Sequence, residues 1–106
     1  MARFQDVLAA LPACDHLDAL ELSDATGNAV ARLANQPGTA GSVKVYHALF
    51  QEFGAIDAAA ATKGLELYAE HTDDARAFPG KHPNIDRLFA IADGAPALAV
   101  TLIQRS

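Results

Sequence analysis

The sequence has little of what disulfide-linked, zinc-binding or nucleic-acid-binding domains use. Cys14 is the only cysteine, so neither an internal disulfide nor a cysteine-cluster zinc site can form. We interpret it as a small buried hydrophobic residue rather than a reactive thiol. Eight lysines and arginines stand against 13 aspartates and glutamates, which gives a formal net charge of −5 at pH 7. Nucleic-acid binders usually carry a basic stripe, and none is visible, so we expect no nucleic-acid partner.

Long apolar runs are also missing. The longest nearly apolar stretch, residues 95–103, contains Pro96 and Thr101, and it falls well short of the roughly 20 residues of a membrane-spanning helix. The N-terminal segment has an acid, Asp6, where a secretory signal would need an apolar run. We therefore expect no membrane partner and a cytoplasmic location.

Alanine is what the sequence has in abundance. Of the 106 residues, 24 are alanine, while leucine, isoleucine, valine and phenylalanine together number 26. This supply of apolar residues supports one compact domain over residues 1–106 and argues against intrinsic disorder. Because few core side chains are large, we expect alanine to let helices pack closely.

Glycine, proline and apolar spacing divide the chain into seven expected elements. They are helices at residues 2–11, 39–53 (or 42–53), 57–77 and 84–94, and strands at residues 17–23, 29–34 and 97–104. Phe4 and Tyr68 fall on the apolar inner faces of their helices, and Asn84 is expected to cap the last helix. Gly27 is expected to be left-handed in a hairpin turn, Gly54 to end the second helix, and Gly64 to allow a kink in the long third helix. His47 lies at the border of an apolar helix stripe, which favours a half-buried structural role. The last strand is apolar on both faces, which predicts a central or doubly covered position.

The order αββαααβ indicates an α+β fold, because helices and strands are segregated rather than alternating. We expect a small antiparallel sheet, made of the N-terminal hairpin and the C-terminal strand, packed by about four helices. Such a small sheet leaves open edges. Pairing of edges or helices between two subunits would enlarge the core, so a homodimer is a further expectation.

The densest polar stretch, residues 70–87, predicts a first candidate site. His71 and Asp74 share one helix face, and a Pro-Gly turn would fold His82 and Asp86 back toward them. Two imidazoles and two carboxylates suit a divalent metal or an acid–base pair, whereas helix capping and ion pairing are the structural alternative. The spacing matches no specific metal motif, so no metal and no cofactor is assigned. The ligand-binding candidates are His71, Asp74, Arg76, Lys81, His82 and Asp86.

A glycine-bearing loop at residues 37–44, between a strand and a helix start, predicts a second candidate site. Outward-pointing N–H groups and the helix dipole favour an anion there. The Gly-x₄-Gly-Lys-Ser/Thr spacing of a phosphate loop is absent, and helix capping by Thr39 or Ser42 explains the same residues. The anion-loop candidates are Gly38, Thr39, Gly41, Ser42 and Lys44.

A family resemblance is carried by residues 15–24 with 26–28, 36–42, 64–73 and 79–88. In these stretches the chain resembles a family of small bacterial proteins described only as a domain of unknown function. The resemblance implies a bacterial cytosolic protein. It brings no activity, substrate or catalytic residue that could be assigned to these positions.

Two functions remain open from the sequence. The first is a small non-enzymatic interaction or regulatory domain that binds a partner protein or a second copy of itself. This function fits the lack of a nucleophile motif in the sequence. The second is a small-molecule, anion or divalent-metal binding protein, catalytic or not, with a site around His71, Asp74 and His82. The first predicts an exposed apolar patch, and the second predicts a concave pocket where these side chains meet.

Overall fold

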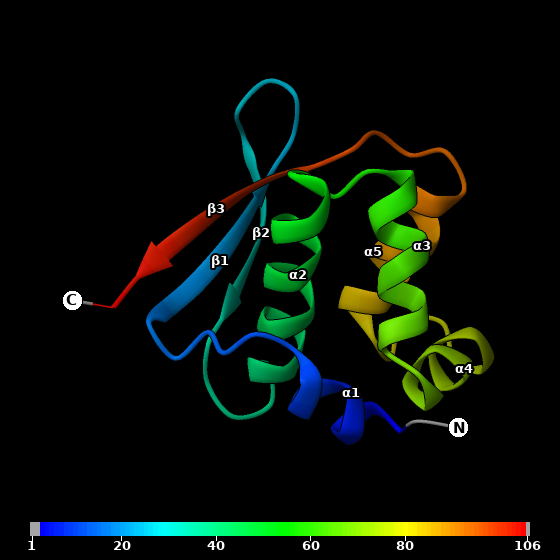
Figure 1. The fold of residues 1–106 in the computed structure, drawn as a ribbon. Helices are drawn as coiled ribbons and strands as arrows, with labels where there is room; N and C mark the ends of the chain where they lie inside the picture. Colours follow the sequence, from blue (N-terminus) through cyan, green and yellow to red (C-terminus); the bar gives the residue numbers. More distant parts are fainter. Residues whose placement is uncertain (1–2, 106) are drawn as a thin grey trace.

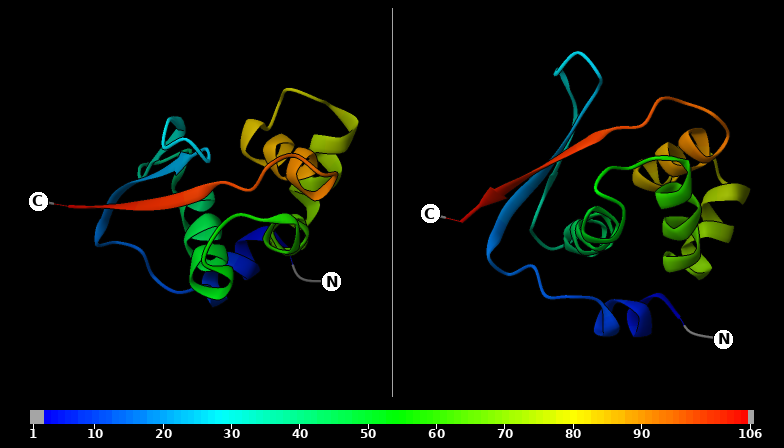
Figure 2. Two further views of the ribbon diagram at one scale, coloured as in Figure 1. Left: turned by 90° about the horizontal axis from the view of Figure 1, so that it is seen from above. Right: turned by 45° about the horizontal axis from the view of Figure 1, so that its top comes forward.

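A computed structural model describes residues 3–105 of the chain and confirms the α+β class, with one helix more than expected (Figure 1). The elements are α1 Phe4–Ala10, β1 Leu17–Ser23, β2 Ala29–Ala34, α2 Ala40–Phe53, α3 Ala58–Leu67, α4 Glu70–Ala77, α5 Pro83–Ala92 and β3 Ala99–Gln104. The central helix α2 lies between the sheet and the pair α3–α5, and α1 crosses near the start of α2 (Figure 2). None of the helices within residues 3–105 is long and apolar enough to cross a membrane.

The sheet is antiparallel throughout, with the order β2-β1-β3. Leu20 of β1 stands opposite Leu33 on one side and Leu102 on the other, so β1 is the central strand. The prediction of a central or doubly covered β3 is wrong. β3 is an edge strand in which Ala99 and Thr101 are exposed. Its two apolar faces gave no indication of strand order, because order depends on pairing between distant segments.

The hairpin and the end of α2 follow the predicted turn chemistry. Gly27 has φ +90° and Gly54 has φ +79°, the left-handed conformation that glycine adopts without a steric penalty. In the hairpin turn, Asp24 Oδ1 accepts hydrogen bonds from the N–H groups of Thr26 and Asn28, at 2.9 and 3.1 Å. Local sequence signals therefore suffice for these two turns.

The expected long helix at residues 57–77 is instead two helices. The chain breaks at Tyr68 and Ala69, and Ala69 has φ +52°, the one non-glycine residue between Arg3 and Arg105 with a positive φ. The hydroxyl of Thr72 donates to the carbonyl of Leu65 at 2.5 Å, which satisfies an acceptor in the last turn of α3. The break turns α4 away from the axis of α3.

The predicted kink at Gly64 is wrong, and this glycine has a packing role. An added Cβ would lie 2.7 Å from Cδ1 of Leu88 and 2.9 Å from Cδ1 of Leu49. Gly64 thus lets α3 approach α5 and α2 closely.

Helix α5 begins one residue earlier than predicted. His82, not Asn84, occupies the N-cap position, and Pro83 follows as the first helical residue, where its missing N–H costs nothing. The hydroxyl of Tyr46 on α2 donates to the carbonyl of Asn84 at 2.5 Å. The start of α5 is therefore fixed against the middle of α2.

His47 is more deeply buried than predicted. Its side chain is 3% exposed, and Nδ1 has no hydrogen-bond partner within the described part of the chain. Burial, followed by the nearby charge of His16, lowers the pKa of His47 below 6.5. The ring meets that of His16 edge-on, with 5.8 Å between centroids, and the structural role stays a prediction.

Candidate functional site

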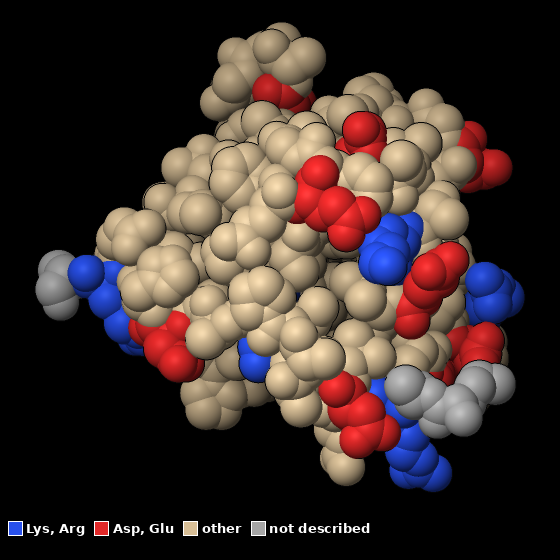
Figure 3. Space-filling model, viewed as in Figure 1, with Lys and Arg blue, Asp and Glu red and all other residues tan. Residues whose placement is uncertain are grey.

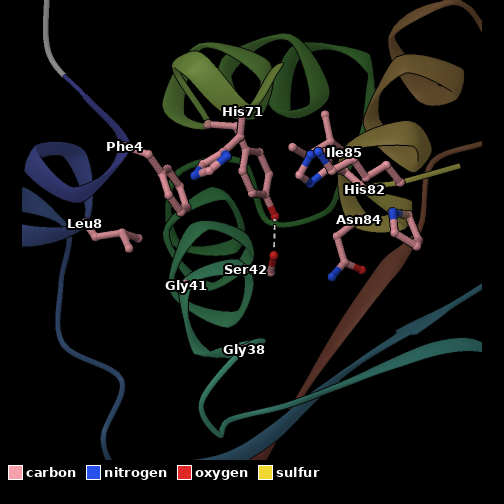
Figure 4. Close-up of a pocket in the computed structure, with 12 residues that line it drawn as sticks. Phe4, Leu8, Gly38, Gly41, Ser42, His71, His82, Asn84 and Ile85 are labelled. Carbon is pink, nitrogen blue, oxygen red and sulfur yellow. Dashed lines mark hydrogen bonds between the residues drawn. The ribbon is translucent and has the colours of Figure 1, made fainter. Parts of the chain in front are cut away.

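One cavity of about 460 Å³ lies where α2 and α5 begin (Figure 4). We call it the α2–α5 cavity. The first turn of α2, the start of α5, the junction of α3 with α4, and α1 contribute to its walls. The lining residues are Phe4, Leu8, Gly38, Gly41, Ser42, Tyr68, His71, Lys81, His82, Pro83, Asn84 and Ile85. Two candidate sets that are separate in the sequence therefore share one hollow.

Asp74 organises the imidazole side of this cavity. Its Oδ2 atom lies 2.6 Å from Nε2 of His82 and accepts a second contact from Nζ of Lys81 at 3.0 Å. The hydrogen bond from His82, followed by that from Lys81, lowers the pKa of the Asp74 carboxyl. Asp74 thus stays a carboxylate and holds His82 and Lys81 in place at the cavity wall.

An aromatic group forms the opposite wall. The ring of Phe4 stacks on Tyr68 with 5.3 Å between centroids, and it meets His71 edge-on at 4.9 Å. The His71 and His82 rings are 5.8 Å apart. The backbone N–H of Phe4 also donates to Oε1 of Glu70 at 2.7 Å. These contacts hold α1 against the start of α4.

Tyr68 and Ser42 link this wall to the glycine-bearing loop. The Tyr68 hydroxyl donates to Oγ of Ser42 at 2.7 Å (Figure 4). Burial raises the pKa of Tyr68 well above its usual range, so the phenol keeps its proton. Because Ser42 accepts from Tyr68, its own hydroxyl proton is available to a ligand.

The predicted capping role of Thr39 and Ser42 is wrong in its detail. Thr39 occupies the N-cap position of α2, but its side chain makes no capping hydrogen bond. The N–H groups of Gly41 and Ser42 have no backbone acceptor within residues 3–105. The first turn of this helix therefore offers free donors beside the cavity.

The remaining predicted residues lie elsewhere. Lys44 lines an adjoining hollow of about 260 Å³ beside Cys14 and Asp15, which shares Leu8 and Gly41 with the α2–α5 cavity. Arg76 and Asp86 line a third hollow, of about 480 Å³. Neither of these two hollows is lined by His71 or His82. Of the six ligand-binding candidates, the structure therefore brings together His71, Asp74, Lys81 and His82.

Arg76 and Asp86 have local structural contacts instead. Arg76 pairs with Asp73 at 3.4 Å on the exposed side of α4, and its guanidinium lies over the ring of Phe89 at 5.1 Å. Asp86 accepts a hydrogen bond from the N–H of Gly80 at 2.9 Å. Asp86 thereby fixes the turn between α4 and α5, as the structural alternative expects.

Charged groups do not gather into a patch of one sign on the face of the molecule drawn in Figure 3, where basic side chains lie beside acidic ones. Between Arg3 and Arg105, no group of three or more histidine, cysteine, aspartate or glutamate side chains is arranged to hold a metal ion. The cavity chemistry is therefore that of hydrogen-bond donors and imidazoles.

Sequence reasoning missed the aromatic wall and the start of α5. Tyr68 and Phe4 were expected as core-facing helix residues, a pattern that does not distinguish a core position from a cavity wall. Asn84 was expected only as a helix cap. A signal for Phe4 was present in the apolar spacing of residues 4–11, but nothing local placed it beside His71.

Comparison with known proteins identifies the family of this chain. The sequence profile of a family described as "Uncharacterized protein conserved in bacteria (DUF2322)" matches residues 4–102. No curated protein and no solved structure matches the chain.

Proposed function

The chain belongs to this bacterial family over nearly its whole length, and from that premise we propose that it binds a small molecule through an anionic group in the α2–α5 cavity. The observation that carries this proposal is the shared lining of the cavity. Gly41 and Ser42, at the start of α2, line the same hollow as Lys81 and His82, at the start of α5.

The donors suit an anion for a simple electrostatic reason. The N-terminal end of a helix carries a partial positive charge, and both α2 and α5 begin at this cavity. The free N–H groups are those of α2, because α5 begins with Pro83 and the N–H of Ile85 already donates to the carbonyl of His82. Lys81 adds a full positive charge and the Ser42 hydroxyl adds a donor. Asp74 is the acid closest to these groups, and its carboxylate is already paired with His82 and Lys81.

The other walls favour a ligand that also has an apolar or aromatic part. Phe4, Leu8 and Ile85 line the cavity beside Tyr68. A planar group packed against Phe4 would cover apolar surface without displacing the donors. The ligand class that fits best is therefore a phosphate or carboxylate attached to an apolar or aromatic group.

Titration with phenyl phosphate in a calorimeter tests this proposal, and Lys81→Ala is the informative variant. Hydrogen bonds to charged groups contribute about 1.5–3 kcal/mol, so loss of the Lys81 ammonium should weaken binding by about tenfold or more. Lys44→Ala is the matched control, because it removes the same charge from a residue that does not line the α2–α5 cavity. No heat of binding to the wild-type protein, or equal weakening by both variants, would contradict the proposal.

The prediction of an interaction domain stays a prediction, and so does the homodimer. Among residues 3–105, the exposed large apolar side chains are Val30 on β2 and Phe78 just after α4, and these two elements lie apart in Figure 1. They do not form the patch that an interaction domain would favour. We also propose that the protein acts in the cytoplasm, since a single buried cysteine requires no oxidising compartment.

A further inference from the structure

We propose that the α2–α5 cavity hydrolyses a phosphate ester, with His82 as general base, His71 as general acid and Asp74 as the residue that positions His82. This inference rests on the proposed function, because the phosphate of the ester is the anionic group that the cavity binds. It adds a reaction to a binding site.

The hydrogen bond between Asp74 and His82 defines which ring nitrogen can act. Oδ2 of Asp74 lies 2.6 Å from Nε2 of His82, and a carboxylate can only accept, so the proton of the neutral ring is on Nε2. Nδ1 then carries the lone pair, and the contact with Asp74 is made by the other ring nitrogen. A base oriented by a carboxylate through its other nitrogen is the arrangement that acid–base catalysis requires.

His71 supplies the second proton-transfer group. Its ring is 5.8 Å from that of His82, and both residues line the cavity (Figure 4). No carboxylate bonds the His71 ring in the described part of the chain, whereas His82 is bonded to Asp74. The two imidazoles therefore have different surroundings, which suits different roles.

The reaction is a displacement at phosphorus by water. Nδ1 of His82 takes a proton from water as the water oxygen forms a bond to phosphorus. The bond from phosphorus to the ester oxygen breaks, and that oxygen receives a proton from the protonated ring of His71. The products are inorganic phosphate and an alcohol or phenol, and exchange of protons with solvent restores both rings. No oxidation or reduction takes place.

Charge on the phosphoryl oxygens would be stabilised by groups already described. Gly41, Ser42 and Lys81 line the cavity, and the N–H groups of Gly41 and Ser42 and the ammonium of Lys81 would donate to these oxygens. Phe4 and Leu8 provide the surface for the alcohol or phenol part. The substrate class is thus a phosphate ester of an aromatic or apolar alcohol.

The test uses 4-nitrophenyl phosphate and phenyl phosphate, which differ in how much their leaving oxygen needs a proton. We expect the wild-type protein to hydrolyse both, and His82→Ala to lower kcat for both by about 10²–10⁴-fold, the usual contribution of a general base. His71→Ala should lower kcat for phenyl phosphate at least about tenfold more than for 4-nitrophenyl phosphate, since nitrophenolate leaves more readily without an acid.

Asp74→Asn tests how His82 is positioned. It should lower kcat, because the amide no longer fixes the ring proton on Nε2, and calorimetry with inorganic phosphate gives the separate effect on Kd that follows from the lost contact with Lys81. Asp73→Asn is the matched control: Asp73 is a neighbour on α4 whose side chain faces solvent beside Arg76. A loss of kcat equal to that of Asp74→Asn in this control would overturn the role of Asp74.

The outcomes distinguish the reaction from the binding site. Phosphate binding without hydrolysis of either ester would overturn the catalytic inference and leave the proposed function standing. No binding of phosphate or of phenyl phosphate would overturn both. Equal hydrolysis by the wild-type protein and by His82→Ala, with both folded by circular dichroism, would also overturn the inference.

Discussion

Gly64→Ala is expected to destabilise the protein, against the ordinary preference of helices for alanine. Gly64 lies inside α3, where alanine would normally stabilise the helix by about 1 kcal/mol. The new Cβ, however, would lie 2.7 Å from Leu88 Cδ1 and 2.9 Å from Leu49 Cδ1. Both distances are far below van der Waals contact, so one side chain or one helix has to move.

The size of the penalty follows from how little these neighbours can move. Leu88 is 0% exposed and Leu49 is 1% exposed, so neither methyl group can turn into solvent. Overpacking of a buried site usually costs about 1–3 kcal/mol. With two clashes at one atom, we expect about 2–3 kcal/mol, and after the helix gain a net loss of about 1–2 kcal/mol in the free energy of unfolding.

Urea unfolding followed by circular dichroism measures this difference. Ala59→Gly, at an exposed position of the same helix, is the control for helix preference alone and should cost about 1 kcal/mol. If Gly64→Ala instead stabilises the protein by about that amount, the close approach of α3 to α5 and α2 is refuted. An unchanged stability would show that the core relaxes around the new methyl group.

Two further predictions concern stability. Asp57→Ala should cost about 1 kcal/mol in urea unfolding, because Oδ1 of Asp57 accepts from the N–H of Ala60 at 2.8 Å and caps α3; an unchanged midpoint would refute this capping contribution. The pKa of His47 is lower in the folded protein than in the unfolded chain, so the unfolded chain binds a proton at this histidine first as the pH falls. The free energy of unfolding should therefore fall as the pH drops from about 7.5 through 6.5. His47→Leu should flatten this fall between pH 7.5 and 5.5, and an equal slope in both proteins would assign the pH dependence to other groups.

The parts of the fold that the sequence predicted are those with strong local signals. Gly27 and Gly54 require a positive φ, and apolar spacing marks the buried side of α2. The break at Ala69 had no such signal. Alanine favours helix, and the apolar spacing from Leu65 to Thr72 continues across the break. Contacts from distant residues, including the bond from Phe4 to Glu70, accompany the turn there.

The sequence predicted only parts of the candidate site, because the other parts depend on contacts between distant residues. Helix spacing placed His71 and Asp74 on one face, and the turn before His82 brought it to Asp74. The meeting of this cluster with Ser42 depends on how α2 packs against α5 and α3, through the bonds from Tyr46 to Asn84 and from Tyr68 to Ser42. Such bonds join residues more than 25 positions apart, which helix and strand spacing cannot anticipate.

The cavity wall comes from four separate segments of the chain, near residues 4–8, 38–42, 68–71 and 81–85. No single segment holds enough of the donors to bind on its own, so a ligand would recognise the folded chain and not the unfolded one. Binding and folding are then linked equilibria, and a ligand at 100 times its Kd would add about 2.7 kcal/mol to the free energy of unfolding. For a domain of this size, a bound ligand would contribute a substantial part of the free energy of unfolding in the cell.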